Sequence, residues 1–268
     1  MSSWAIVGAA RGIGFEYVNQ LSVNKDNTVF ALIRSRSTSG PLEELASQRK
    51  NIHVLETDIS SPKRLKDTAD AVAKITGSKL DVLIQNAFSA GTENMILPPT
   101  AFAGKEEELE REIFESLQVN LLHLIYTVNA FLPLIRNGQT KKIIYISSGI
   151  GDVDVTRASE MPAMLGYAVG KGSGNILMAK YAVELKSEGI LTLSLSPGWV
   201  ATDKAKEVSH NPEAFQAILQ GFQKMDPTVT GMIPTEESVQ KQLSVIKNLD
   251  AATSGSFLSH NGNRDNWF

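Results

Sequence analysis

Residues 4–20 read WAIVGAARGIGFEYVNQ, and this stretch decides the fold that the sequence predicts. A short apolar run, Trp4–Val7, stops at a turn that contains Gly8, Gly12 and Gly14. Glycine permits positive φ angles and leaves no side chain between the backbone and a ligand. A glycine-rich turn between a first strand and a first helix aims backbone N–H groups at a pyrophosphate. Three glycines also fit an ordinary tight turn, but their place at this junction, spaced G-x-x-x-G-x-G, favours a nucleotide-binding fingerprint.

Short apolar runs alternate with helical stretches along the rest of the chain. The runs are nearly continuous, which indicates strands that are buried on both faces. The expected strands are residues 4–7, 29–33, 52–55, 82–84, 143–146, 191–195 and 255–258. The expected helices are residues 12–23, 41–50, 62–76, 105–136, 163–188, 211–225 and 235–249. This alternation predicts one α/β domain over residues 1–268, a doubly wound Rossmann fold whose seven-stranded parallel sheet has helices on both faces.

The composition argues against several classes of protein. Lys and Arg number 26 and Asp and Glu 29, and this net charge of −3 argues against electrostatic binding to nucleic acid or to a membrane surface. The chain has no cysteine, which excludes disulfides, thiolate metal sites and cysteine nucleophiles. Its four histidines form no metal-ligand pair, so we expect no metal site. Without a signal-peptide core, or a run of about 18 apolar residues that could span a membrane, a cytoplasmic protein is expected.

The residues after the second expected strand predict the cofactor. A site for NAD needs an acidic residue there to bind the ribose 2′-hydroxyl. The sequence has Arg34, Ser35 and Arg36 instead, and Arg11 lies in the glycine turn. Guanidinium groups form charge-assisted, bidentate contacts with phosphate, so NADP is the expected cofactor. Alternatively, Arg36 and, less readily, Arg34 are solvated loop residues.

Three residues form a candidate catalytic group. Tyr167 and Lys171 are four residues apart near the start of a helix, so both side chains lie on one face. An ammonium about 4 Å from a phenol, at an effective dielectric constant of about 20, is worth about 4 kcal/mol. This would bring the tyrosine pKa from near 10 towards neutral pH, as general acid catalysis needs. Ser148 follows the fifth expected strand, where it could hold a carbonyl against Tyr167, although serines there also fit helix capping or a turn.

The chain resembles the short-chain dehydrogenase/reductase family over essentially its whole length. The matching motifs occur in the family's order: Gly8, Gly12 and Gly14, then Asp58, Asn86–Ala87, Asn120, Ser148, Tyr167 with Lys171, and Pro197–Gly198 with Thr202. The arginines of the cofactor region, together with GSFLSHNG at residues 255–262, are most similar to the NADP-dependent carbonyl-reductase and sniffer-like branch.

The resemblance implies an oxidoreductase that uses NADP(H) to reduce a ketone or aldehyde to an alcohol, or that catalyses the reverse. Tyr167 would protonate the carbonyl oxygen, Ser148 would orient it, and Lys171 would lower the tyrosine pKa and bind the nicotinamide ribose. Asn120 would hold a water that connects Lys171 to solvent. The implied cofactor-binding residues are Gly8, Arg11, Gly12, Ile13, Gly14, Arg34, Ser35, Asp58, Ile59, Asn86, Ala87, Tyr167, Lys171, Pro197, Gly198, Val200 and Thr202.

Several positions depart from the family's pattern. Val7 replaces a usual threonine, Phe88 replaces the glycine of an N-N-A-G motif, and Gly170 replaces the serine before the lysine. The segments from Ser148 to Tyr167 and from Ser89 to Gly104 are longer than usual. None of these changes removes a catalytic group. Two alternatives remain, a Rossmann protein that binds NADP without redox turnover, as a regulator or scaffold, and a cyclase or isomerase that reuses the fold.

Two further segments predict how the protein meets its partners. Residues 199–234 are expected to cover the active site, and their apolar and Met side chains suit a hydrophobic substrate. The helical spacing of Phe215, Ile218, Leu219 and Phe222 equally fits packing onto the domain. A homodimer or homotetramer is expected from four glycines and from an apolar stripe on the preceding helix. The glycines are Gly166, Gly170, Gly172 and Gly174, and the stripe is Leu117, Leu121, Leu124, Ile125, Val128 and Leu132.

Overall fold

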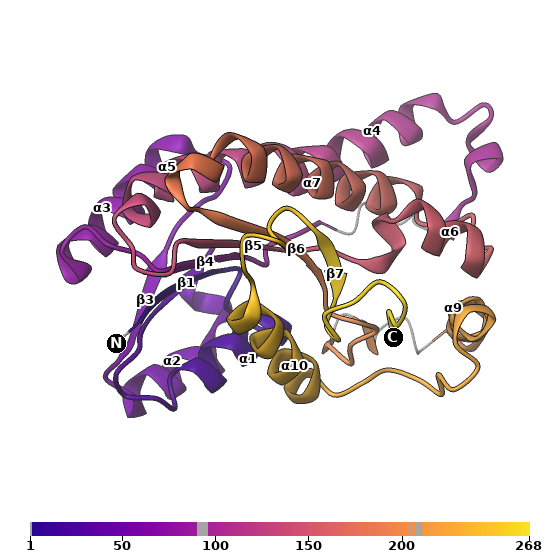
Figure 1. The fold of residues 1–268 in the computed structure, drawn as a ribbon. Coiled ribbons are helices and arrows are strands. Elements are labelled where there is room, and N and C mark those ends of the chain that lie inside the picture. The colour runs from indigo at the N-terminus through magenta and orange to yellow at the C-terminus, as the bar shows by residue number, and fades with distance from the viewer. Residues whose placement is uncertain (1, 90–95, 204, 207–210) are drawn as a thin grey trace.

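A seven-stranded parallel sheet runs through the computed structural model, which describes residues 2–89, 96–203, 205–206 and 211–268 (Figure 1). The strand order is β3-β2-β1-β4-β5-β6-β7. The strands are β1 (Ser3–Val7), β2 (Thr28–Ile33), β3 (Ile52–Glu56), β4 (Val82–Gln85), β5 (Lys142–Ile146), β6 (Leu191–Ser196) and β7 (Phe257–Ser259). The order reverses between β1 and β4, and folds of this kind bind ligands at the carboxyl ends of the strands beside that reversal.

Helices cover both faces of the sheet (Figure 1). One face carries α1 (Gly12–Leu21), α2 (Gly40–Gln48) and α10 (Thr235–Asn248). The other carries α3 (Pro62–Thr76), α4 (Glu106–Leu117), α5 (His123–Arg136) and α7 (Leu165–Glu184). Two more, α6 (Val153–Ser159) and α9 (Pro212–Met225), lie beyond the carboxyl edge of the sheet. This arrangement confirms the predicted doubly wound fold.

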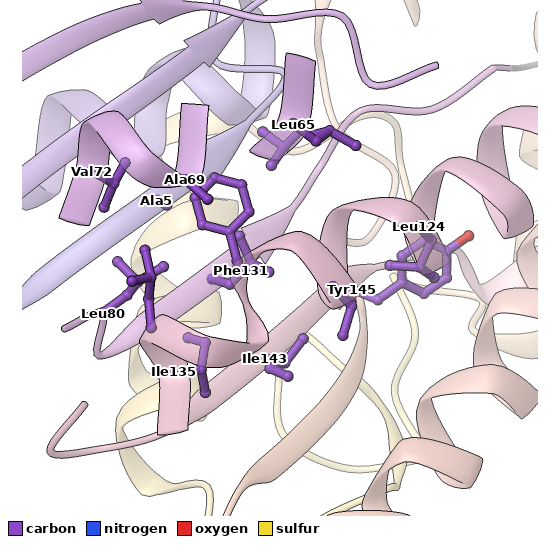
Figure 2. Packing of buried hydrophobic residues seen from close by; sticks show 14 of the residues in the cluster. Ala5, Leu65, Ala69, Val72, Leu80, Leu124, Phe131, Ile135, Ile143 and Tyr145 are labelled. Carbon is purple, nitrogen blue, oxygen red and sulfur yellow. The ribbon is translucent and has the colours of Figure 1, made fainter. Parts of the chain in front are cut away.

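Each face of the sheet has its own apolar core, because successive strand residues point to opposite faces. On β1, Ala5 packs towards α3, α5 and α7, whereas Ile6 packs towards α1 and α10. Figure 2 shows Phe131 of α5 close to Ala5 and Ala69. Phe131 is fully buried, and truncating such a side chain to alanine costs about 3–5 kcal/mol. These cores hold the strand ends, and therefore the site, in place.

The prediction of a single helix over residues 105–136 is wrong in one respect. A π-helical turn, Gln118–Leu122, separates α4 from α5 and places Asn120 in the interior. The stretch Glu106–Arg136 is long and apolar enough to cross a membrane by length and composition alone. It packs against α3, α7 and the sheet, and 44% of its most apolar window is buried inside the structure.

Two other differences concern short elements. The last strand begins at Phe257 rather than at Gly255, which has a φ of +83° and ends the preceding turn. Helix α6 is not expected from the sequence, because seven residues are too few to show helical periodicity. Its N-terminus is capped by Asp152, whose carboxylate accepts hydrogen bonds from the backbone N–H groups of Asp154 and Val155 at 2.9 and 3.2 Å.

Candidate active site

The glycine turn joins β1 to α1 in the way that the sequence predicts. Gly8 has a φ of +82°, and a Cβ added there would lie 2.9 Å from the backbone nitrogen of Ala87. A Cβ on Gly14 would lie 2.1 Å from the Gly8 oxygen, which accepts a hydrogen bond from Asn86 Nδ2 at 3.0 Å. No side chain caps the first turn of α1 at Arg11. The N–H groups at this helix start therefore remain available to an anionic ligand such as a diphosphate.

The three candidate catalytic residues line one cavity of about 450 Å³ at the carboxyl edge of the sheet. Ser148 follows β5, and Tyr167 and Lys171 lie in the first two turns of α7. A hydrogen bond joins the side chains of Ser148 and Tyr167. Lys171 is almost fully buried, and its Nζ donates to the Ile146 carbonyl oxygen at 2.8 Å. The cavity thus contains a hydroxyl pair beside a buried amine.

The expected effect of Lys171 on Tyr167 is wrong in this structure. Burial raises the pKa of Tyr167, and the hydrogen bond with Ser148 only partly offsets this rise. Burial also lowers the pKa of Lys171 to about 7, so the amine is only partly charged at neutral pH. Its Nζ is engaged by Ile146 and lies 5.7 Å from the centre of the Tyr167 ring. Tyr167 is consequently held as a protonated phenol, the form in which it can donate a proton.

Phe88 occupies a place beside the catalytic pair. The centre of its ring lies 5.0 Å from Lys171 Nζ, and the Tyr145 ring lies 4.9 Å from the same atom. Phe88 and Tyr167 meet at 6.0 Å with an angle of 61° between their rings. Cation–π contacts favour the charged amine and oppose the effect of burial. Replacement of the family's glycine by Phe88 therefore adds an aromatic wall next to Lys171.

Asn120 lies behind Gly170 rather than in the cavity lining. Its Nδ2 donates to the carbonyl oxygens of Ser89 and Ser116, both at 3.0 Å. Its Oδ1 is buried and accepts no hydrogen bond from any residue that the structure describes. An unpaired buried carbonyl costs about 1–3 kcal/mol, and a bound water would offset that cost. This geometry fits the expected role of Asn120 as the holder of a water.

The glycines of α7 are explained by contacts within the chain. A Cβ on Gly170 would lie 2.3 Å from Ser116 Oγ and 2.9 Å from Asn120 Nδ2. A Cβ on Gly174 would lie 2.4 Å from the ring of Tyr145. The remaining two also face the same chain, Gly166 against Glu112 and Gly172 against Gly151. These glycines therefore give no indication of a partner helix.

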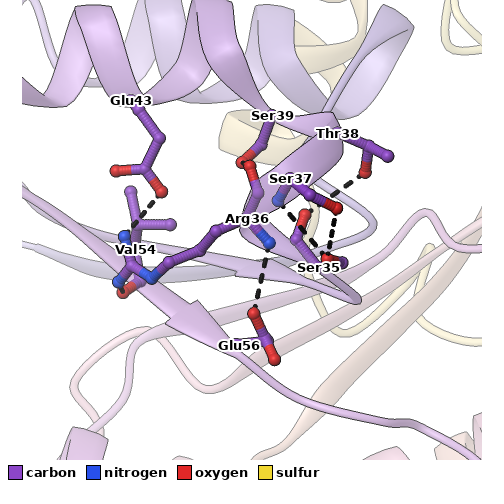
Figure 3. Close-up of polar contacts among 8 residues, drawn as sticks. All are labelled: Ser35, Arg36, Ser37, Thr38, Ser39, Glu43, Val54 and Glu56. Carbon is purple, nitrogen blue, oxygen red and sulfur yellow. Dashed lines mark hydrogen bonds and ion pairs between the residues drawn. The ribbon is translucent and has the colours of Figure 1, made fainter.

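The two arginines after β2 have different surroundings (Figure 3). Arg36 binds Glu43 Oε1 at 2.5 Å through Nη1 and the Val54 carbonyl oxygen at 2.7 Å through Nη2. Arg34 is exposed, and its side chain has no hydrogen bond or ion pair with the described residues. Arg34 is thus available to a phosphate, whereas Arg36 ties the turn to α2 and β3.

Sequence reasoning missed an acidic group beside the turn that follows β2. Glu56, the last residue of β3, pairs in register with Ile33, and its carboxylate accepts a hydrogen bond from the Arg36 backbone at 3.1 Å (Figure 3). Its sequence position gave no signal, because it lies more than twenty residues after the second strand and comes close only through strand pairing. Asp58 lies two residues after Glu56, and hydrogen bonds from Ser60 lower the pKa of the Asp58 carboxyl.

The loop after β6 completes the site. Gly198 has a φ of +84°, and a Cβ there would lie 2.8 Å from the His260 ring. The Thr202 methyl lies 3.4 Å from the Cβ position of Gly12, so this loop closes over the glycine turn.

The structure brings nine of the nineteen predicted site residues together in the lining of one cavity. Those that line the cavity are Ile13, Asn86, Ser148, Tyr167, Lys171, Pro197, Gly198, Val200 and Thr202. The others outside its lining are Gly8, Arg11, Gly12, Gly14 and Ala87 at the glycine turn, Arg34, Ser35, Asp58 and Ile59 after β2 and β3, and Asn120 behind α7.

Aromatic side chains add a further wall to the cavity. Trp199 lies 5.1 Å from Phe215 between ring centres, and Phe222 stacks on Phe268 at 3.9 Å. Helix α9 thus brings part of the predicted covering segment, 199–234, to the cavity; residues 204 and 207–210 of that segment lie outside the described residues. The contribution of Phe268 was missed, because nothing in its sequence context marks it as a cavity residue.

Comparison with known proteins identifies relatives along the full chain. The family model of short-chain dehydrogenases matches residues 3–213. The short-chain dehydrogenase/reductase atnB of Arthrinium sp. is 51% identical over 267 residues and covers 100% of both chains. The short chain dehydrogenase virK of Hypocrea virens is 36% identical, covering 98% of this chain and 99% of its own.

Solved structures agree with the fold. The carbonyl reductase Sniffer of Drosophila melanogaster superposes with a TM-score of 0.77 over 98% of each chain, at 23% identity. The NADPH-bound carbonyl reductase from chicken fatty liver superposes with a TM-score of 0.75 over 98% of each chain, at 25% identity. The carbonyl-reductase branch that the sequence resembles is therefore represented among its structural neighbours. On these matches and on the fold, the chain belongs to the short-chain dehydrogenase/reductase family of oxidoreductases.

Proposed function

We propose that this oxidoreductase uses NADP(H) to reduce an apolar ketone or aldehyde to an alcohol, or catalyses the reverse reaction. The observation that carries the proposal is the hydrogen-bonded pair of Ser148 and Tyr167 in a cavity shared with Lys171. Two hydroxyl groups side by side can both donate to one carbonyl oxygen. The rest of the lining is largely apolar and aromatic, which suits a hydrophobic substrate.

The residues present fit NADP as the cofactor. The uncapped start of α1 and the glycine turn, which a Cβ at Gly14 would fill, suit a diphosphate. Arg34 and Arg11 are exposed and have no side-chain hydrogen bond or ion pair among the described residues, so both can bind a 2′-phosphate. A neighbour of similar fold is described as NADPH-bound, which supports the same choice. When bound, NADPH supplies the hydride.

The chain's own residues handle the proton and the carbonyl. Ser148 donates a hydrogen bond that orients the carbonyl oxygen, and Tyr167 transfers its phenolic proton to that oxygen as the alcohol forms. Lys171, buried with a pKa of about 7, can return a proton to the phenolate. A water held by the Oδ1 of Asn120 would connect Lys171 to solvent.

A panel of ketones and aldehydes with NADPH, followed at the nicotinamide absorbance band, tests the proposal. We expect turnover with at least one apolar carbonyl and its loss in Tyr167→Phe, while NADPH binding persists in both proteins. NADPH binding without turnover across a broad panel would overturn the proposal. That result would favour the alternatives, a nucleotide-binding regulator or a non-redox enzyme.

A further inference from the structure

A side pocket of about 230 Å³ adjoins the catalytic cavity. Ile150, Met164 and Ile218 line both spaces, so the two lie side by side. An engineered apolar cavity of about 150 Å³ is large enough to hold benzene. The side pocket therefore has room for a substantial apolar group of a molecule whose reacting carbonyl lies at Tyr167.

The segment Glu160–Met164 supplies one side of this pocket and belongs to the long connection between Ser148 and Tyr167. Glu160 and Met164 have φ angles of +52° and +63°, in the left-handed region that side chains other than glycine rarely adopt. Backbone strain of this kind persists only where the surrounding structure enforces it, and it clusters at functional sites. The strained ends fix Met161 against α9, where a Cβ on Gly221 would lie 2.6 Å from the Met161 side chain.

The two spaces differ in the chemistry of their walls. The catalytic cavity is lined by aromatic rings, including Phe88, Trp199 and Phe215. The described lining of the side pocket contains no aromatic ring and consists mainly of Met, Ile, Ala and Pro side chains. Unbranched methionine side chains adapt to flexible aliphatic groups. The walls therefore suit a planar or compact carbonyl-bearing group in one space and an alkyl chain in the other.

An ion pair limits the side pocket at its outer end. Lys224 on α9 binds the carboxylate of Glu160, and both residues belong to the pocket lining. This contact joins α9 to the strained segment across the rim. An alkyl chain that extends past it would have to enter solvent or break the ion pair. The pocket consequently favours chains up to a certain length.

We infer that the side pocket binds the alkyl chain of the substrate, so that the preferred substrate is a ketone or aldehyde carrying an aliphatic chain on its carbonyl-bearing group. This inference rests on the proposed carbonyl reduction and adds its substrate class. Binding of the chain is remote from the reacting bond and equal before and in the transition state. It therefore lowers KM and leaves kcat nearly unchanged.

The test is a series of phenyl alkyl ketones, from acetophenone to octanophenone, reduced with NADPH. We expect kcat/KM to rise about fourfold for each added methylene until the pocket is filled, and then to level off. This rise in kcat/KM should come from a lower KM, with kcat nearly unchanged. A value of kcat/KM that does not change with chain length, while acetophenone is reduced, would overturn the inference and leave the proposed function intact.

Two matched variants on α9 test whether the dependence of kcat/KM on chain length arises in the side pocket. Ala217 lines the side pocket, and Ala217→Phe should reduce the ratio of kcat/KM between octanophenone and acetophenone at least tenfold. Gln216 is the neighbouring exposed position and lines neither space, so Gln216→Phe should keep the wild-type ratio. Equal ratios in the two variants would show that the chain binds elsewhere.

A binding measurement separates this inference from catalysis. Titration calorimetry with the secondary alcohols that correspond to the two ketones should give a dissociation constant at least tenfold lower for the longer alcohol. Ala217→Phe should remove that difference, and Gln216→Phe should retain it. If no ketone is reduced but this difference in binding is found, the proposed function fails and the alkyl site stands; if the difference is missing, the site is refuted.

Discussion

The phenol of Tyr17 on α1 donates a 2.7 Å hydrogen bond to Oε1 of Gln242 on α10, and both side chains are fully buried. Gln242 in turn donates to Ser238 Oγ at 2.8 Å, and Ser238 donates to the Pro197 carbonyl oxygen at 2.6 Å. This chain of hydrogen bonds connects the helix after the glycine turn with the loop after β6. Both cofactor-binding segments are therefore positioned by one buried polar network.

Removing the hydrogen bond from Tyr17 to Gln242 should destabilise the protein. Tyr17→Phe leaves the Gln242 oxygen buried without a donor, which costs about 1–3 kcal/mol of unfolding free energy. Tyr181→Phe is the matched control, because its phenol donates to Asn129, which is exposed and can bond to water instead. Urea denaturation should show a larger loss for Tyr17→Phe than for Tyr181→Phe. Equal losses would mean that the network adds nothing specific.

Cofactor choice should depend on Arg34 and not on Arg36. Contacts of Arg34 with a 2′-phosphate are worth about 1.5–3 kcal/mol, so NADPH should bind at least tenfold more tightly than NADH. Arg34→Asp should narrow or reverse this preference. Arg36→Ala should keep it, because Arg36 is engaged by Glu43 and Val54. Titration of nicotinamide fluorescence measures the dissociation constants of both cofactors for the three proteins, and equal affinities in the wild type would contradict the assignment.

The carboxylate of Glu56 should weaken NADPH binding. It lies against the backbone of Arg36, at the turn where the 2′-phosphate is expected, and like charges repel across partly exposed sites. Glu56→Gln should therefore raise the NADPH preference several-fold at low ionic strength and less at high salt. An unchanged ratio of the two affinities at low salt would place the phosphate away from Glu56.

Tyr167→Phe should separate binding from chemistry. The variant lacks the proton donor, so turnover should fall by at least the ~10²-fold typical of general acid catalysis, while NADPH still binds. Lys171→Ala should impair both, because Lys171 is expected to contact the ribose and to return the proton. Steady-state rates and NADPH titrations provide the two readouts. Near wild-type turnover in Tyr167→Phe would assign the acid to another group.

Stability of the cofactor-free protein should increase with pH above neutrality. Burial lowers the pKa of Lys171 from 10.5 to about 7, so between these values the unfolded chain binds a proton that the folded chain does not. The unfolding free energy therefore rises with pH between these two values, by at most about 1.4 kcal/mol per pH unit. The protein is correspondingly less stable near pH 7 than at higher pH in this window.

Thermal unfolding from pH 7 to 9.5 measures this slope. Lys171→Met removes its contribution and should reduce the slope, whereas Tyr167→Phe should preserve it; burial also lowers the pKa of Lys142, which adds a smaller contribution of the same sign in both variants. The His260 pKa, lowered to about 4 by burial, acts in a separate window below pH 6.5 and does not overlap it. A slope that is undiminished in Lys171→Met would assign it to other groups.

We propose that two copies of the chain associate through α7. Leu124 and Val128 of the expected stripe are buried within the monomer. Val169, Ile176 and Val183, in contrast, repeat every seven residues along one side of α7 and are 40%, 66% and 77% exposed. An isologous dimer would cover this face. Light scattering should give twice the chain mass of 29.1 kDa at micromolar concentration.

The matched pair for this face is Ile176→Arg and Val153→Arg. Val153 is 73% exposed but lies on α6, away from the proposed interface. Ile176→Arg should weaken association at least tenfold, and Val153→Arg should leave it unchanged. A wild-type mass near that of one chain would rule out the dimer.

The sequence predicts the fold well where signals are local. Continuous apolar runs mark the strands, and the glycine turn marks the start of α1. The π-helical turn at Gln118–Leu122 is not predictable in this way, because it depends on how Ser116 and Asn120 fit against Gly170 of α7. Such contacts join segments about fifty residues apart and leave no periodic trace.

In the candidate site, too, the residues with local sequence signals are predictable and the properties set by tertiary contacts are not. Tyr167 and Lys171 are recognisable from their spacing and from the order of the surrounding motifs. Their pKa values are not recognisable in this way, since burial of both side chains outweighs the attraction that spacing alone suggests. Glu56 and Phe268 reach the site through strand pairing and tertiary packing, so single-sequence reasoning does not find them.

The close fit of Gly170 against Ser116 limits the order in which the sequence can change during evolution. A side chain at position 170 would occupy the space of the Ser116 hydroxyl, 2.3 Å away, and would also press on Asn120. Loss of the hydroxyl at position 116 would remove the closer of these two contacts and leave the one with Asn120 Nδ2 at 2.9 Å. Gly170→Ser alone should therefore carry the penalty of these close contacts, whereas Ser116→Ala alone should not.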